Sequence, residues 1–324
     1  MASQASMTTP PSISPGSPIR VIATAGAVDA SGLTKGTDLL AGVPYFLEVR
    51  QDLQTLLSVD MYYAGSDELR TSELLDALDE KGVEAIWAAR GASPRGYGTA
   101  RILYDGEVQS TVIQSLQSKP RWLVGYSDLT ALIALWNKAG VLALHGPMAA
   151  NIQTFSKAAV NATFDVLFAT ATATQEFQGS MRFNGSGGVK GRILGGNLSV
   201  LTSLVGSGLL PSYEGAILFI EDVNEQAYRL DRMLSTVLHS SDFRGIVGIA
   251  VGQLVGSDPA NGRYTALELL DKTWGPLGIP VLTGLPIGHD ALTAMPLALG
   301  AVGEISFEEG ATMGVLKVEI PRTA

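Results

Sequence analysis

Ser127 is the first candidate for chemistry in this sequence, because it stands between an apolar run and an apolar-periodic stretch in WLVGYSDLTALIALW, residues 122–136. As a helix N-cap, its hydroxyl would accept a hydrogen bond from an amide of the first helical turn. As a nucleophile on a sharp strand-to-helix turn, it would project from the sheet edge, where helix amides can stabilise an oxyanion. The motif is G-x-S-x-L, which carries half of the G-x-S-x-G signature.

A serine nucleophile needs a base, and the chain has three histidines. His239 ends a charged helical stretch, where a cation complements the helix dipole, so we expect a surface role. His145 follows VLAL and precedes Gly-Pro, which suits a packed histidine as well as a site contact. His289 follows Gly288 in VLTGLPIGHD, and the glycine lets the backbone turn so that the ring can project. His289 is therefore the preferred base.

The third member of such a set would be a carboxylate that orients the imidazole. Glu221 directly follows an apolar strand in AILFIEDVNEQAYRLDRML. Asp222 and Glu225 suit the cap and first turn of the following helix. Since an unpaired buried charge is costly, Glu221 requires a partner and is the preferred acid.

Short apolar runs alternate with amphipathic stretches through the first half of the chain. This alternation predicts an α/β fold with a doubly wound parallel sheet, whose chemistry lies at the carboxyl ends of its strands. We expect a disordered arm over 1–17, an N-terminal domain with the nucleophile over 18–150 and an inter-domain crossing over 151–186. A C-terminal α/β domain over 187–324, with a mixed or barrel-like sheet, would hold the acid and the base.

Composition narrows the function. The chain has 324 residues and a formal charge of −9. It contains no cysteine, which excludes disulfides and thiol chemistry. The chain has no dense Lys/Arg stretch of the kind that indicates nucleic-acid binding. The chain has no apolar run of 18 residues, which a membrane span would require. Its Ser/Thr/Pro-rich start does not resemble a signal peptide, so we expect a cytoplasmic protein. With no cysteine and few histidines, no metal or other cofactor is suggested.

The sequence resembles the LD-carboxypeptidase family in four motifs, which occur in the family's order. They are GYSDLTALI with HGPM shortly after, GRILGGNLSVLTSLVGS, LFIEDVNEQAYRLDRML and GLPIGH. The resemblance extends from Ile19 to Pro321 and implies serine peptidase chemistry with a Ser127, Glu221 and His289 triad. It also implies an oxyanion hole built from the Asp128 amide and a glycine amide in an Arg-Gly-Gly-Tyr-Gly loop. That loop reads ARGASPRGYGTAR here, as though about four residues were inserted, so Gly91 and Gly96 both stay open as donors.

The substrate that the resemblance implies is a murein tetrapeptide, from which the terminal D-alanine is removed, and the family commonly forms homodimers. The glycines of LGGNL could cradle a phosphate, but no lysine follows them, and the resemblance instead makes the turn part of the substrate cleft. We expect substrate contacts from Asn197, Gly196 and Tyr126. Candidate partners for the substrate carboxylates are Arg90, Arg95 and Arg101.

Two alternatives stay open. The family's immunity branch cleaves a peptidyl-nucleotide antibiotic, and a base-stacking tryptophan in the cleft, from Trp87, Trp122, Trp136 or Trp274, would favour that substrate. A non-catalytic α/β ligand-binding protein would be favoured by loss of a triad member, and the sequence retains all three.

Overall fold

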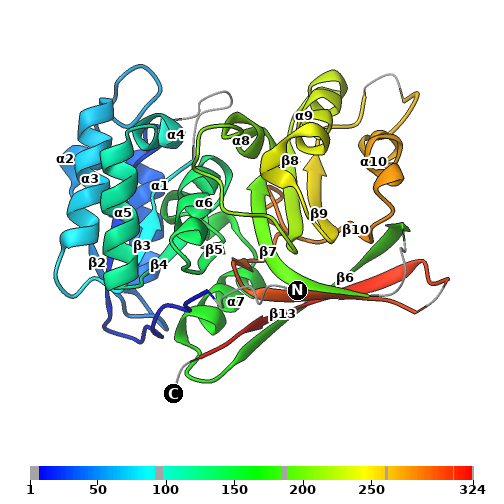
Figure 1. The fold of residues 1–324 in the computed structure, drawn as a ribbon. Coiled ribbons are helices and arrows are strands. Elements are labelled where there is room, and N and C mark those ends of the chain that lie inside the picture. The colour runs from blue at the N-terminus through cyan, green and yellow to red at the C-terminus, as the bar shows by residue number, and fades with distance from the viewer. Residues whose placement is uncertain (1–6, 92–97, 184–187, 260–261, 309, 323–324) are drawn as a thin grey trace.

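Two α/β domains lie side by side in the computed structural model of the chain (Figure 1). The structure describes residues 7–91, 98–183, 188–259, 262–308 and 310–322. Within these residues, no helix combines the length and the apolar character needed to cross a bilayer.

The first domain is built on a six-stranded sheet with the order β11-β5-β4-β3-β1-β2. All neighbours are parallel except β11, which runs antiparallel to β5. The predicted doubly wound parallel sheet is therefore confirmed. Its strands are β1 Pro18–Ile22, β2 Glu48–Arg50, β3 Ala85–Ala88, β4 Trp122–Gly125, β5 Ala143–His145 and β11 Leu297–Leu299.

Seven α-helices belong to the described part of this domain, and α3 and α5 lie together on one side of its sheet (Figure 1). Helix α6 is buried from Thr130 to Asn137, because it lies between the sheet and the second domain. The helices are α1 Ala30–Ala41, α2 Leu53–Leu56, α3 Asp67–Asp79, α4 Gly98–Leu103, α5 Gly106–Ser118, α6 Thr130–Lys138 and α7 Lys157–Phe168, with 3-10 turns η1 Ser127–Leu129 and η2 Ala149–Thr154.

The second domain is a closed barrel with the strand order β10-β6-β13-β12-β7-β8-β9. Strands β7 to β10 are parallel neighbours and the other pairs are antiparallel, so the expected mixed, barrel-like sheet is confirmed. The strands are β6 Ala173–Phe183, β7 Val189–Asn197, β8 Ile217–Val223, β9 Gly248–Val255, β10 Val281–Thr283, β12 Val302–Ser306 and β13 Met313–Ile320. Its helices are α8 Leu198–Ser203, α9 Ala227–His239 and α10 Ala266–Trp274, with 3-10 turns η3 Ser241–Phe243 and η4 Gly275–Leu277.

The predicted disordered arm is wrong for residues 7–17. Met7 and Ile13 are buried, and Thr8 forms a bridge with Val141. The Pro11 carbonyl accepts a hydrogen bond from the Trp122 indole at 3.0 Å. These contacts satisfy backbone groups and bury apolar side chains, which a Ser/Thr/Pro-rich composition does not reveal. Residues 1–6 lie outside the described part of the chain.

The predicted crossing over 151–186 also needs correction, because it contains α7 and the 11-residue strand β6. Strand β6 pairs with β13 from Ala173 to Ser180, so the barrel begins before residue 187. Its polar sequence, ATQEFQGSMRF, is that of a strand with one solvated face, which lacks the continuous apolar run of a buried parallel strand.

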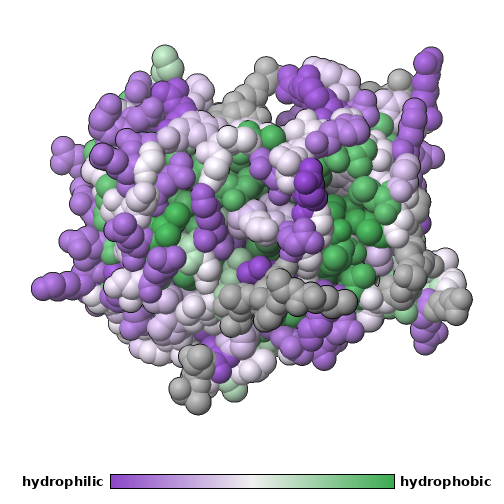
Figure 2. Space-filling view, in the orientation of Figure 1, coloured by the Kyte–Doolittle hydropathy of each residue, from purple (hydrophilic) through white to green (hydrophobic). Residues whose placement is uncertain are grey.

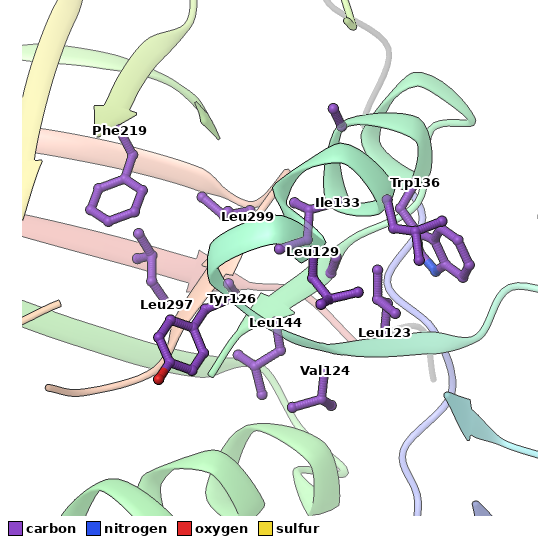
Figure 3. Packing of buried hydrophobic residues seen from close by; sticks show 14 of the residues in the cluster. Leu123, Val124, Tyr126, Leu129, Ile133, Trp136, Leu144, Phe219, Leu297 and Leu299 are labelled. Atoms are coloured by element: carbon purple, nitrogen blue, oxygen red, sulfur yellow. The ribbon is translucent and has the colours of Figure 1, made fainter. Parts of the chain in front are cut away.

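The hydrophobic core is continuous between the domains. Phe219 of β8, Leu297 of β11 and Tyr126, which follows β4, approach one another at the domain boundary (Figure 3). Figure 2 shows that hydrophilic residues dominate over the outer helices of the first domain, while hydrophobic residues gather toward the domain boundary and beside β9 and β10. The strands that carry the predicted acid and nucleophile therefore end within one shared apolar environment.

Candidate active site

Ser127 occupies a strained turn at the carboxyl end of β4. Its φ of 61° is in the left-handed region, which a non-glycine residue rarely adopts. Tyr126 and Leu129 take the N-cap positions of η1 and α6, and neither position has a side-chain cap bond. The interpretation of Ser127 as a helix cap is therefore wrong. The half-buried side chain sits on a strand-turn-helix elbow, where strain often accompanies function.

Two glycines make room for this elbow. A Cβ on Gly125 would lie 2.9 Å from Ala88 Cβ, so a side chain there would collide with the adjacent strand. A Cβ on Gly91 would lie 3.3 Å from Ser127 Oγ. Gly91 therefore lies against Ser127, the nucleophile candidate. Gly96, the alternative donor, falls outside the described residues.

Glu221 and His289 form a close pair. Glu221, at 0% exposure on β8, has its Oε2 atom 2.6 Å from His289 Nδ1. Burial raises the pKa of Glu221, but the charge and the hydrogen bond of His289, with His145 nearby, outweigh it and lower that pKa to about 2. Burial lowers the pKa of His289, and the Glu221 carboxylate outweighs that effect and raises it. The pair thus has the geometry and charge of an oriented general base.

Gln253 was missed by the sequence reasoning, although it holds the loop of His289. Its backbone amide donates to the Ile287 carbonyl at 2.9 Å. Its side chain accepts from the Asp290 amide at 2.8 Å and donates to Thr293 Oγ1 at 2.8 Å. The register of β8 and β9 shifts between Ile220 and Asp222, and such bulges re-aim side chains beside active sites. A lone glutamine in VGQL offers no sequence signal of this role.

Gly288 lies between Gln253 and Glu221, where there is no space for a side chain. Its φ is 151°, and an added Cβ would lie 3.0 Å from Gln253 Oε1 and 3.2 Å from Glu221 Oε2. We expect Gly288→Ala to lower kcat/KM by about 100-fold, because the pair must shift away from the nucleophile. Steady-state kinetics on the substrate proposed below measures this effect.

Gly284→Ala is the matched control. Gly284 lies in the same loop with φ of 76°, but an added Cβ there meets nothing within 4 Å. Both variants should lose about 1 kcal/mol or more of folding stability through backbone strain. Only Gly288→Ala should lose activity, and equal activity losses would contradict the crowding argument.

Tyr126 connects the turn of Ser127 to His289. Its ring lies 4.9 Å from the His289 ring in an edge-on arrangement, and its hydroxyl accepts a hydrogen bond from Asn151 at 2.9 Å. Burial raises the pKa of Tyr126 to about 12. Ser127 thus follows a residue that touches the base, although no hydrogen bond joins Ser127 Oγ to His289 among the described residues. Such contacts often tighten only when substrate binds.

Comparison with known proteins shows the family of the chain. Family models of the LD-carboxypeptidase N-terminal and C-terminal domains match residues 19–146 and 190–305. A murein tetrapeptide carboxypeptidase of Pseudomonas aeruginosa is 30% identical over 241 residues, which cover 71% of this chain and 75% of that protein. The chain belongs to the LD-carboxypeptidase family.

Two further similar proteins extend the comparison. The microcin C7 self-immunity protein MccF of Escherichia coli is 26% identical over 282 residues, covering 77% of this chain and 78% of that protein. The structure of a muramoyltetrapeptide carboxypeptidase from Oxalobacter formigenes has the same fold, with a TM-score of 0.79 at 24% identity over 94% of this chain and 100% of that chain. The predicted family and the prediction of a carboxypeptidase are confirmed.

Asp128 joins the turn of Ser127 to helix α4. Its Oδ2 atom accepts a hydrogen bond from the Thr99 amide at 2.8 Å. Burial raises the pKa of Asp128 to about 6, although Thr99 and the Arg70 charge act to lower it. The side chain is thus a structural tie, and the predicted oxyanion donor is the backbone amide of the same residue.

Asn197 and Gly196 belong to the joint between the domains. Asn197 is 3% exposed, its Nδ2 donates to Asp222 at 3.0 Å, and its Oδ1 caps α8 by accepting from Val200 at 3.2 Å. The Asn197 amide donates to Thr130 Oγ1 at 2.9 Å. A Cβ on Gly196 would lie 2.5 Å from the same Thr130 atom. The structure therefore shows that both residues help to join the two domains, and the substrate contacts expected for them stay a prediction.

Asp222 accepts hydrogen bonds at the joint between the domains, whereas Glu221 contacts His289. Burial and then the Glu221 charge raise the pKa of Asp222 to about 7. Its oxygens accept hydrogen bonds from Asn197 and from the amides of Ser199 and Val223. Adjacent carboxyl groups thus have pKa values displaced in opposite directions, and the one with the low pKa faces His289.

The arginine candidates differ in their surroundings. Arg101 is paired with Asp67 at 2.7 Å, whereas Arg90 donates to the Ala27 carbonyl at 2.9 Å and forms no ion pair among the described residues. Arg95 lies outside the described part. No group of three or more His, Asp or Glu side chains in the described ranges is arranged to hold a metal ion.

Proposed function

We propose that this protein is a serine LD-carboxypeptidase that removes D-alanine from murein tetrapeptide through Ser127, His289 and Glu221. The observation that carries the proposal is the 2.6 Å hydrogen bond between the buried Glu221 and His289, whose ring contacts Tyr126, the residue before a serine at φ of 61°. A strained serine next to an imidazole oriented by a carboxylate is the arrangement of an activated nucleophile.

In the proposed reaction, His289 takes the proton of Ser127 as Oγ attacks the scissile carbonyl carbon. The tetrahedral intermediate collapses when the carbon–nitrogen bond breaks and His289 protonates the leaving amine of D-alanine. Water then attacks the acyl-enzyme, gives a proton to His289 and releases the shortened peptide, while the proton returns to Ser127. Glu221 stabilises the imidazolium at both stages.

Stabilisation of the oxyanion comes from backbone amides in this proposal. The Asp128 amide follows the nucleophile, and Gly91 lies against Ser127, so these two are the proposed donors. One such donor contributes about 3 kcal/mol to transition-state stabilisation in comparable sites.

The proposed substrate is a murein peptide with free carboxylates, met in the cytoplasm during recycling. The names of the relatives from Pseudomonas aeruginosa and Oxalobacter formigenes support this substrate class. Arg90 precedes Gly91, is exposed and has no ion-pair partner in the described residues, so we assign the contact with a substrate carboxylate to it.

Mass spectrometry of the purified protein with L-Ala-γ-D-Glu-meso-diaminopimelyl-D-Ala tests the function. The matched substrate control is the same tetrapeptide with a terminal L-alanine. We expect loss of one alanine from the D-substrate alone. Loss from both peptides would contradict the LD specificity, and loss from neither would overturn the murein substrate.

A peptidyl-nucleotide is the second candidate substrate, because the relative MccF has been solved with glutamyl sulfamoyl guanosine. The four tryptophans that could stack on a base are all at most 1% exposed, and their indole N–H groups donate to backbone carbonyls. Since none of them can meet a ligand, this observation favours the murein peptide. The presence of all three triad residues likewise argues against a non-catalytic binding protein.

We also propose a homodimer, formed through apolar side chains that gather in residues 43–62. This segment borders the site, because the Ala27 amide donates to the Tyr62 carbonyl and the Gly26 amide to the Gly91 carbonyl. Exposed apolar side chains in such number mark an interface. They are Val43, Phe46, Leu53, Leu57, Val59, Met61 and Tyr62.

Light scattering after size-exclusion chromatography should give the mass of a dimer for the wild type and of a monomer for Val59→Glu with Met61→Glu. These two side chains are 65% and 83% exposed, so the charges disturb an interface without disturbing the core. Met313→Glu, at a 52% exposed methionine of the barrel, is the control and should leave the mass unchanged. A monomeric wild type would contradict the dimer, and a dimeric double variant would contradict this surface.

A further inference from the structure

His145 is a buried histidine of the site that the proposed reaction does not use. It ends β5 in the first domain, and its side chain is 2% exposed. Its Nε2 atom lies 3.8 Å from Oε1 of Glu221, the carboxylate oxygen that does not contact His289. Both atoms are buried and have no hydrogen-bond partner among the described residues.

Two unpartnered polar atoms that face each other in a dry environment are complementary. A buried carboxylate oxygen without a donor is unfavourable, and so is a buried imidazole nitrogen without a partner. The 3.8 Å separation exceeds the usual hydrogen-bond limit of about 3.2 Å. A relative movement of well under 1 Å would bring the two atoms within that limit, so the contact can form without rearranging the fold.

We propose that His145 is a positioning residue whose Nε2–H donates to Glu221 Oε1 and holds the carboxylate with Oε2 toward His289. This inference rests on the proposed roles of Glu221 and His289. With both oxygens bound, the carboxylate cannot rotate away from the base. Glu221 is then held between two histidines, one from each domain.

Packing around His145 supports this orientation. Its ring lies 5.7 Å from the Tyr126 ring and 5.5 Å, edge-on, from the Phe219 ring. Its backbone pairs with Gly125 on one side and with Leu297 on the other. Figure 3 shows Tyr126, Phe219 and Leu297 around this boundary. Strand β5 pairs with β4, which precedes Ser127. The His145–Glu221 contact would therefore fix the position of His289, the base from the second domain, relative to Ser127.

Two variants separate positioning from packing. His145→Leu fills the space without a donor, and we expect kcat to fall by about 10- to 100-fold with little change in KM, as for a lost hydrogen bond to a charged group. His145→Gln places an amide N–H close to the position of Nε2 and should keep kcat within about fivefold of the wild type. Equal kcat values for His145→Leu and the wild type would overturn the proposal.

NMR of the imidazole nitrogens provides a readout that does not depend on substrate. The chain has three histidines, and His239 is exposed and serves as the reference. We expect a proton on Nε2 of His145 in the wild type. We also expect the downfield Nδ1 proton of His289 to persist in His145→Gln and to broaden in His145→Leu.

The outcomes distinguish this inference from the proposed function. If the wild type cleaves no murein peptide but these NMR signals are found, the substrate is wrong and the positioning contact stands. If the wild type cleaves the peptide but His145 carries its proton on Nδ1 alone, the contact is overturned and the function stands. The wild-type spectrum decides the contact even where His145→Leu fails to fold.

Discussion

Ser127→Ala is expected to lower kcat by about five to six orders of magnitude, the effect of deleting the nucleophile of a triad. The oxyanion amides and the substrate contacts would remain, so KM should change little. Measurement requires a sensitive assay, such as isotope-labelled D-alanine release, with the variant purified separately from any active enzyme. Residual activity within about tenfold of the wild type would remove Ser127 from the mechanism.

Stability measurements on the same position distinguish a strained nucleophile from a helix cap. Ser127→Gly should raise the free energy of unfolding by about 1 kcal/mol, because glycine adopts a φ of 61° without strain. Ser127→Ala should be close to neutral, since the hydroxyl makes no cap bond in the structure. Loss of a true cap would instead destabilise the alanine variant by about 1 kcal/mol. Denaturant titration of the three proteins measures the difference.

Glu221→Gln is expected to lower kcat/KM by about 10⁴-fold and to move its pH dependence. The Glu221 carboxylate raises the pKa of His289, and the base must be neutral to accept the Ser127 proton. Wild-type activity should therefore fall as the pH decreases through a value above 6.5, the ordinary pKa of histidine. Without the negative charge, the pKa of His289 falls, so the acid limb of the profile moves to lower pH.

Glu225→Gln is the matched control, because Glu225 was the rival acid in the same segment and is paired with Arg229 at 3.8 Å on the helix side. Its pH profile should coincide with that of the wild type. An acid limb that stays in place for Glu221→Gln, or one that moves for Glu225→Gln, would contradict the assignment of the orienting carboxylate.

Much of the fold could be predicted because parallel sheets have a strong sequence pattern. Strands β3, β4 and β5 are buried on both faces and appear as short apolar runs, separated by amphipathic helices. Glu221 and His289 could be proposed because each follows an apolar run in the sequence, where a buried charge or imidazole requires a partner. The structure brings the side chains of Glu221 and His289 together across 68 residues of sequence.

Other parts depended on contacts that the local sequence does not contain. Strand β6 was missed because one solvated face makes it polar, and the ordered arm because its apolar residues are sparse among serines and prolines. Gln253 and the second acid, Asp222, act through backbone amides of distant segments. The strain at Ser127 was also out of reach, because a capping serine and a nucleophile have the same local pattern and differ only in φ.

Strand β11 has a consequence for how the chain acquires its structure. Leu297–Leu299 complete the sheet of the first domain by pairing with β5, although about 150 residues separate the two strands. During synthesis on the ribosome, the edge of β5 that includes His145 stays open until nearly the whole chain has emerged. An unpaired strand edge invites association with other chains. We therefore expect a fragment that ends near residue 150 to aggregate, and expression of this enzyme to depend on completion of the barrel.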